Sequence, residues 1–161
     1  MITQIVWITQ IFSLILVMAG MPNLRLVLPA PQPEVEVVLS NIKSAKGVFV
    51  ISFYNDDKSF PKPGHEAFTE KVIVKDTLVH TVKIKLPAEG WYAIAMFQDE
   101  NETGKIKQDE IGIPLEAYGF SNNVHPKTSA PKFAACRFYV GAVTNAPVAI
   151  RLIQPKLFKK L

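Results

Sequence analysis

Hydrophobic and polar residues alternate with a period of two along much of the chain after residue 33. In residues 34–42 (EVEVVLSNI) and 80–87 (HTVKIKLP) apolar residues recur at every second position. This is the pattern of a strand with one buried face. Residues 47–54 (GVFVISFY) and 90–97 (GWYAIAMF) are apolar on both faces. We therefore expect these two segments to be central strands that are covered on both sides.

Three further β-rich segments bring the expected total to about seven strands. They are residues 68–75 (FTEKVIVK), 136–140 (CRFYV) and 147–153 (PVAIRLI). Prolines and glycines are spread along the chain and mark turns between the segments. Inside this part of the chain, helical apolar spacing does not extend over ten or more residues, and only a short helical turn near residues 131–135 fits the pattern. We predict an all-β domain over residues 34–154, an antiparallel β-sandwich with short turns.

The N-terminal region differs from the rest of the chain. Residues 1–24 contain no charged side chain, and residues 11–19 (IFSLILVMA) form an apolar run of the length found in signal peptides. Val17 and Ala19 occupy the small-residue positions of a cleavage site after Ala19. The first seven residues lack Lys and Arg, so an uncleaved membrane anchor is the alternative. We expect residues 1–20 to direct the protein to the periplasm or the extracellular space.

The segments on either side of the predicted domain carry little chemistry. Residues 21–33 contain four prolines and are expected to form an extended linker. Residues 155–161 form a basic tail with three lysines, but the formal net charge of the chain is only +4. The other basic residues are scattered, whereas a nucleic-acid binder concentrates them on one face. We expect no nucleic-acid partner, and membrane contact only through an uncleaved N-terminal segment.

The polar loop DENETGKIKQDE, which begins at Asp99 and ends at Glu110, follows an apolar strand and has the spacing of a calcium loop. In that alignment Asp99, Asn101 and Thr103 supply side-chain oxygens at alternate positions before a glycine. The Lys105 carbonyl and the Glu110 carboxylate complete the set of oxygen ligands that Ca²⁺ prefers. Ca²⁺ is therefore the one candidate cofactor; otherwise none is predicted.

The same loop has a simpler interpretation. Thr103 offers a neutral hydroxyl where the calcium template prefers a carboxylate or an amide, and Lys105 and Lys107 bring positive charge into the loop. A solvated hairpin in which Asp99 and Asn101 accept hydrogen bonds from backbone amides of the turn also fits the residues. The pattern alone leaves both interpretations open.

Residues that could act in catalysis do not form a recognisable catalytic arrangement. His65, His80 and His125 stand in separate segments without zinc-ligand spacing. Cys136 is the only cysteine and is expected to pack as a small apolar residue of a strand. We therefore predict that the protein is not an enzyme. An envelope hydrolase is the alternative, and its best candidate residues are Asp99, Asp109, Glu110 and Glu116.

Three segments of the chain resemble domain of unknown function 2141, an uncharacterised family of exported bacterial proteins. They are residues 90–106 (GWYAIAMFQDENETGKI), 111–123 (IGIPLEAYGFSNN) and 131–140 (PKFAACRFYV). The resemblance covers about residues 34–153 and implies a sandwich of the immunoglobulin or transthyretin kind, a periplasmic or surface location and no established activity. The chain departs from the usual loop of the family at Glu102, Thr103 and Lys107.

The segment YGFSNN at residues 118–123 also has two interpretations. The rings of Tyr118 and Phe120 with the amides of Asn122 and Asn123 are the groups of a sugar-binding surface, because rings stack on sugars and amides bond hydroxyls. Alternatively, the rings close the core and the polar residues satisfy a turn. We expect a non-catalytic envelope module that binds an envelope protein or a glycan at the end that carries the polar loop. A calcium-stabilised structural domain is the alternative.

Overall fold

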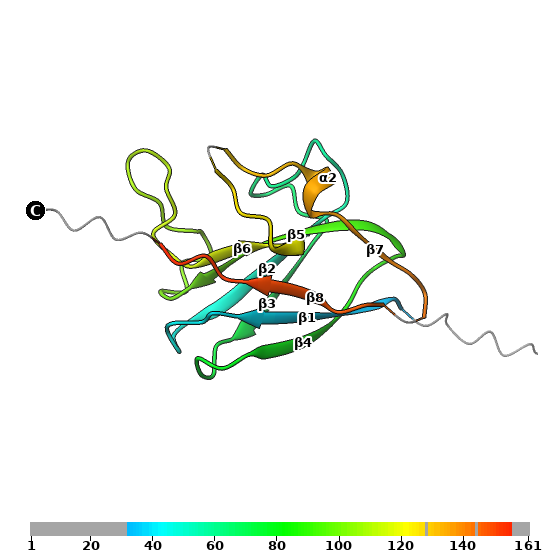
Figure 1. Ribbon diagram of the computed structural model, residues 1–161, viewed down its shortest axis with the longest axis horizontal. Coiled ribbons are helices and arrows are strands. Elements are labelled where there is room, and N and C mark those ends of the chain that lie inside the picture. Colours follow the sequence, from blue (N-terminus) through cyan, green and yellow to red (C-terminus); the bar gives the residue numbers. More distant parts are fainter. Residues whose placement is uncertain (1–31, 128, 144, 156–161) are drawn as a thin grey trace, which may run out of the picture. The chain divides into compact units, whose positions relative to one another are not determined.

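The computed structural model describes residues 32–127, 129–143 and 145–155 (Figure 1). Almost all of the regular structure in these residues is β. The strands are β1 (Glu34–Ser40), β2 (Val48–Tyr54), β3 (Phe68–Ile73), β4 (His80–Lys85), β5 (Gly90–Asp99), β6 (Tyr118–Phe120), β7 (Phe138–Val140) and β8 (Val148–Arg151). A 3₁₀ turn, η1 (Ser121–Asn123), and one turn of α-helix, α2 (Phe133–Cys136), complete the elements. The prediction of an all-β class is confirmed.

The predicted signal peptide or anchor (residues 1–20) lies outside the described residues. The same holds for nearly all of the predicted linker (21–33) and for the basic tail beyond Pro155. In the described ranges, no helix has the length and apolar character needed to cross a membrane.

The strands form two sheets. The smaller sheet has the order β4-β1-β8, and the larger has the order β3-β2-β5-β6, with β7 also paired to β5. All of these pairs are antiparallel except β1 and β8, which run parallel in the register Val37↔Val148. The prediction of a wholly antiparallel arrangement is wrong for this pair. Alternation within a strand specifies its buried face but not the direction of its neighbour.

Each of the seven predicted segments contains a strand, and an eighth strand lies where no strand was predicted. This strand, β6, is only three residues long and has Gly119 at its centre, so it lacks the length and the β-branched residues of a strand signal. Cys136 was predicted to belong to a strand but is the last residue of α2. The strand that follows begins at Phe138.

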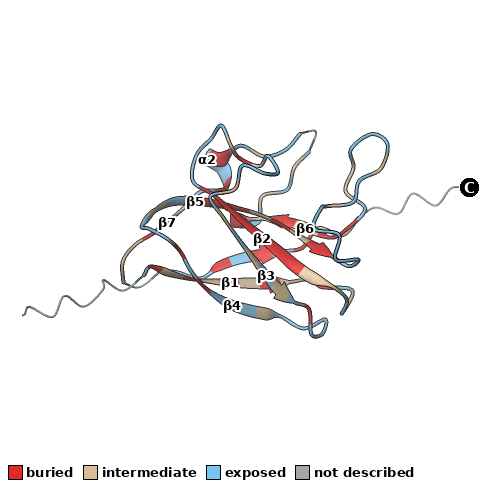
Figure 2. Ribbon diagram, turned by 180° about the vertical axis from the view of Figure 1, so that it is seen from behind, coloured by how far each residue is buried: buried red, intermediate tan, exposed pale blue. Residues whose placement is uncertain are grey.

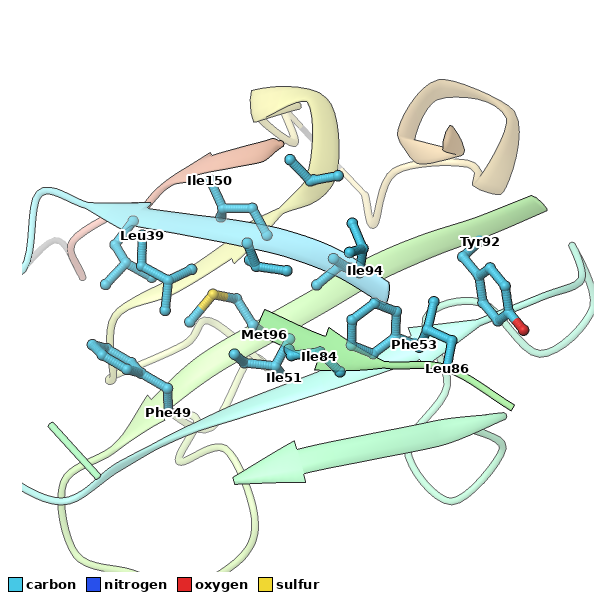
Figure 3. Packing of buried hydrophobic residues seen from close by; sticks show 14 of the residues in the cluster. Leu39, Phe49, Ile51, Phe53, Ile84, Leu86, Tyr92, Ile94, Met96 and Ile150 are labelled. Atoms are coloured by element: carbon cyan, nitrogen blue, oxygen red, sulfur yellow. The ribbon is translucent and has the colours of Figure 1, made fainter. Parts of the chain in front are cut away.

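Both sheets contribute side chains to one hydrophobic cluster (Figure 3). From the smaller sheet come Leu39, Ile84 and Ile150, and from the larger sheet come residues such as Phe53 and Ile94. The alternating burial along β1 places every second residue in this cluster. Burial of each large apolar side chain contributes roughly 1.5–3 kcal/mol relative to exposure, so the cluster is the main force that holds the two sheets together.

A second cluster covers the other face of the larger sheet. It contains Ala93 of β5 and Tyr54 of β2 together with Phe60, Phe133 and Cys136 from the connecting segments. Ala93 lies between Tyr92 and Ile94 of the first cluster, and successive strand residues point to opposite faces. Buried residues consequently occupy most of β2 and β5 (Figure 2). This explains why both segments are apolar at consecutive positions.

A glycine at the start of β2 lets two strands meet closely. Gly47 has a φ of +69°, and a Cβ atom added there would overlap the backbone carbonyl oxygen of Asp99. Gly104 has a similar φ of +76°, but nothing lies within 4 Å of the position of its Cβ. A substitution at Gly104 therefore adds backbone strain alone, whereas a substitution at Gly47 adds backbone strain and a steric clash.

We predict that Gly47→Ala lowers the free energy of unfolding by about 3 kcal/mol, because it adds a backbone clash to the strain of a left-handed residue. Gly104→Ala bears the backbone strain alone and is expected to cost about 1 kcal/mol. Urea denaturation of both variants and the wild type measures the difference. Equal losses for the two variants would show that β2 and the end of β5 do not meet as described.

Candidate functional site

The connection between β5 and β6 is longer than the sheet requires. These strands are antiparallel neighbours, with Phe97 opposite Tyr118, and two residues suffice to join such a pair. The chain instead leaves the sheet over residues 100–117 and returns as a long irregular loop (Figure 1). Long loops on a rigid scaffold are a common location of binding residues. The loop 100–117 and the strand end before it therefore form the candidate site.

Asp99, the last residue of β5, is fully buried and holds the first turn of the loop. Its Oδ1 accepts a hydrogen bond from the backbone amide of Thr103 at 3.0 Å, and its Oδ2 accepts one from the amide of Gly104 at 2.6 Å. The Thr103 hydroxyl donates to the Lys105 carbonyl at 3.0 Å. Donors within the loop itself thus satisfy the carboxylate, as the solvated-hairpin interpretation expects for Asp99.

The structure connects three of the five predicted calcium ligands. Asp99, Thr103 and Lys105 are joined by hydrogen bonds in which Asn101 and Glu110 take no part. Of the five residues only Asp99 is buried. Across the residues that the structure describes, no group of three or more His, Cys, Asp or Glu side chains converges as a metal ligand set. Calcium at this loop stays a prediction, and it would have to compete with backbone amides for the Asp99 oxygens.

A second acidic residue organises the tip of the loop. The Oδ1 atom of Asp109 accepts hydrogen bonds from the amides of Ile111 at 3.1 Å and Ile113 at 2.8 Å. The backbone amide of Asp109 donates in turn to the Ile113 carbonyl at 3.0 Å. This turn holds Ile111 at the tip, where 79% of the residue is exposed. The tip therefore presents an apolar side chain on an ordered turn.

A third acidic residue, Glu116, holds the returning half of the loop. It is only 6% exposed, and its Oε2 accepts a hydrogen bond from the backbone amide of Lys107 at 2.9 Å. The amide of Leu115 donates to the Lys107 carbonyl at 2.8 Å, which ties the two halves together. The Oε1 atom of Glu116 is buried and has no hydrogen-bond partner.

Glu116 also lines a pocket of about 320 Å³ at the base of the loop. The lining residues are Glu100, Asn101, Lys107, Leu115, Glu116, Ala117, Gln154 and Pro155. Sequence reasoning considered Glu116 only as a catalytic acid and missed this role. The one available signal was its position between apolar neighbours directly before a segment that returns to the sheet.

The predicted sugar-binding residues have structural partners. The Asn122 side-chain amide donates to the carbonyls of Ala135 and Arg137, both at 3.1 Å. The Asn123 side-chain oxygen accepts a hydrogen bond from the backbone amide of Arg151 at 2.7 Å. These contacts tie the 3₁₀ turn η1 to α2 and to β8. They leave the amides less free for a sugar, although sugar binding itself stays a prediction.

The two aromatic rings of the same segment lie against other rings. The centroids of Tyr118 and Phe120 are 6.0 Å apart, and that of Phe120 is 6.2 Å from the ring of Phe60. Phe120 packs against the second hydrophobic cluster. Edge-to-face contacts of this kind stabilise packing, so both rings take part in closing the outer face of the larger sheet.

Sequence reasoning also missed the role of Ser121, which is fully buried next to Cys136. The Ser121 hydroxyl donates to the Cys136 carbonyl at 2.6 Å and accepts from the amide of Ile94 at 2.9 Å. Cys136 is buried in the second cluster, as expected for a packing residue. Burial raises the pKa of its thiol to about 11, which keeps the sulfur protonated and unreactive near neutral pH.

An aromatic surface lies at the other end of β5, away from the loop. Trp91 and Tyr139 are cross-strand partners, and their ring centroids are 5.5 Å apart. The guanidinium carbon of Arg137 lies 4.7 Å from the centroid of the Trp91 ring. Both aromatic residues are exposed. The guanidinium already occupies a cation–π position at the tryptophan, so part of this surface is used within the protein.

The strands and the loop define a class of protein: a two-sheet β module in which carboxylates hold a long insertion between two paired strands. Residues 37–147 match the model of the family described as an uncharacterized protein conserved in bacteria, domain of unknown function 2141, and the chain belongs to this family. The family membership expected from the sequence is confirmed. No curated protein and no solved structure matches the chain.

We predict that Asp99→Asn lowers the free energy of unfolding by about 2 kcal/mol, because an amide NH₂ would face a backbone N–H where the carboxylate oxygen accepted a hydrogen bond. Glu110→Gln is the matched control, since Glu110 is an exposed acid of the same loop. Its expected effect is within about 0.5 kcal/mol. Urea denaturation measures both values, and an unchanged midpoint for Asp99→Asn would contradict the role assigned to Asp99.

Proposed function

We propose that this protein is a non-catalytic, exported module of the bacterial envelope that binds another envelope protein through the loop 100–117. The observation that carries the proposal is the loop itself. Its two ends leave and rejoin adjacent antiparallel strands, so the sheet does not require it. Ordering the residues of a loop costs conformational entropy. A binding role explains why this loop is ordered although the sheet does not need it.

The internal bracing suits a binding surface. Asp99, Asp109 and Glu116 each fix backbone amides of the loop. A surface that is ordered before the partner arrives loses less entropy on association. Ile111 is 79% exposed at the tip and Leu115 is 37% exposed nearer the base. Exposed apolar side chains on an ordered loop favour a protein partner over a glycan, because desolvation of such side chains contributes to protein association.

Other observations support the location and the architecture within the proposal. The matching family is conserved in bacteria, and residues 1–20 have the apolar character of a signal peptide or an anchor. The two sheets share one hydrophobic cluster, which supports a sandwich of the immunoglobulin or transthyretin kind. Modules of this architecture commonly present their loops at the ends of the sheets.

The hydrogen bonds that hold the loop also argue against the two alternatives, an envelope hydrolase and a calcium-stabilised domain. An envelope hydrolase would rely on the acids around the loop, yet hydrogen bonds from loop amides already engage Asp99, Asp109 and Glu116. A calcium-stabilised domain would need the same Asp99 oxygens. In both cases the loop would have to give up the contacts that hold it. The binding role needs no such rearrangement.

We predict that Ile111→Ser weakens binding of the envelope partner by at least about tenfold, because the complex then loses the burial of an apolar side chain that is exposed in the free protein. The protein is purified from the periplasm and used to capture partners from an envelope extract. The affinity of the captured protein is then measured by calorimetry. Val143→Ser is the matched control, since Val143 is 87% exposed in the connection between β7 and β8, which follows the pair Gly90↔Val140 at the other end of β5.

The control variant should bind like the wild type, and both variants should retain the wild-type melting temperature. Equal affinity of Ile111→Ser and Val143→Ser would refute binding through the loop. Failure to find the protein in the envelope or medium fractions would refute the exported location. A captured glycan in place of a protein would refute the assignment of the partner class.

A further inference from the structure

One carboxylate oxygen at the base of the loop lacks a hydrogen-bond partner. The Oε2 atom of Glu116 accepts a hydrogen bond from the Lys107 amide, but Oε1 is buried without any partner. The whole residue is 94% buried, since its exposed fraction is 6%. Buried polar atoms are almost always paired, because an unpaired one has lost its hydration without compensation. This oxygen therefore points to a donor that binds there.

The pocket beside Glu116 suggests the form of that donor. Leu115, Ala117 and Pro155 supply an apolar part of its lining. Glu100, Asn101 and Gln154 supply polar groups. A long side chain with a methylene stem and a polar end matches such a lining, because the stem packs on apolar surface while the end group makes hydrogen bonds.

The charge of the lining indicates a ligand with one positive charge. Glu100 and Glu116 are acidic and Lys107 is basic, so the lining carries one net negative charge. A divalent metal would leave excess positive charge. It would also need more oxygen ligands than two carboxylates provide, and the described residues contain no metal-binding group of three such side chains. An organic cation with a single charge balances the lining and needs fewer oxygen ligands than a metal ion.

The free acceptor distinguishes between the two common organic cations of proteins. A guanidinium prefers to bind both oxygens of a carboxylate with two parallel hydrogen bonds. At Glu116 the Lys107 amide already occupies Oε2, at 2.9 Å. Oε1 has no partner, so a ligand with a single donor is enough to complete the carboxylate. A lysine ammonium is a compact charge that binds a single oxygen, so it fits this site better than an arginine does.

We propose that the pocket binds the side-chain ammonium of a lysine on the partner protein, with Glu116 Oε1 as its buried acceptor. This inference rests on the proposed function and adds the chemistry of recognition to it. The rim contains Glu100, Asn101 and Lys107, which are exposed. Because Oε1 is itself buried, the ammonium reaches it only if side chains of this lining move.

The chain itself also contains lysines that offer the same ammonium group. Pro155 lines the pocket, and the sequence continues with Lys156, Lys159 and Lys160. A lysine of the tail would be present at a high effective concentration. We assign the pocket to the partner because Glu100, Asn101 and Lys107 belong to the loop that carries the proposed interface. The experiment separates the two sources.

The test uses Nα-acetyl-lysine methylamide as the probe and the full exported protein. The probe is titrated while the backbone amide resonance of Lys107 is followed by NMR, because this amide is bonded to Glu116. We expect a saturable shift with a dissociation constant in the millimolar range. Nα-acetyl-norleucine methylamide has a similar stem without the charge and should cause no saturable shift.

Two variants test the assigned acceptor. Glu116→Gln keeps the size of the side chain and removes its charge, and we expect probe affinity to fall at least about tenfold. Glu100→Gln removes an exposed charge at the rim and should lower affinity by only about two- to threefold. If Glu116→Gln does not fold, the Glu100→Gln variant decides. Lower probe affinity in Glu100→Gln supports the pocket, and unchanged probe affinity overturns the proposal. Glu89→Gln, an exposed acid outside the loop 100–117, is the control and should bind like the wild type.

Several outcomes overturn the proposal. They are no saturable shift with the lysine probe, an equal shift with the norleucine probe, a saturable response to Ca²⁺, or undiminished binding by Glu116→Gln. Binding that emerges only in a Lys156→Gln, Lys159→Gln, Lys160→Gln triple variant would assign the pocket to the tail and overturn the partner assignment. If Ile111→Ser loses the partner while the probe fails, only the lysine proposal falls.

Discussion

The structure depends most on the junction at Asp99, where β5 ends and the long loop begins. On one side, the backbone of Asp99 lies opposite Val48 of β2 and so close to Gly47 that no larger residue fits there. On the other side, its buried carboxylate holds the amides of Thr103 and Gly104. A single residue thus links the rigid sheet to the loop. The position of the loop follows from this link, and so does the proposed binding surface.

Buried polar side chains elsewhere hold irregular backbone in the same way. The Gln98 side chain is buried and donates to the carbonyls of Ser44 and Lys46 at 2.8 and 2.9 Å. Ser121 connects β5 to the end of α2. Apolar clusters hold the sheets together, whereas hydrogen bonds from such side chains fix segments that have no strand partner. The chemistry of these polar residues is therefore largely structural.

The sequence predicted what depends on local patterns. Alternation in residues 34–42 and 80–87 identified β1 and β4, and the Asx-type hydrogen bonds of Asp99 were one of two interpretations of the loop. Other features depend on contacts between distant segments. The parallel pairing of β8 with β1 and the short strand β6 leave no signature of their own. Glu116 was predicted only as a hydrolase residue, because its buried, unpartnered oxygen and the pocket that it lines depend on the fold.

The central proposal is that the carboxylates of Asp99, Asp109 and Glu116 order the loop 100–117 without a metal ion. Amide hydrogen exchange measured by NMR in the presence of a chelator tests it most directly. The account predicts that the amides of Thr103, Gly104, Lys107 and Ile113 exchange at least about a hundredfold more slowly than in an unstructured chain, with no change when millimolar Ca²⁺ is added. Unprotected exchange of these amides in chelator, or protection that requires Ca²⁺, would contradict it.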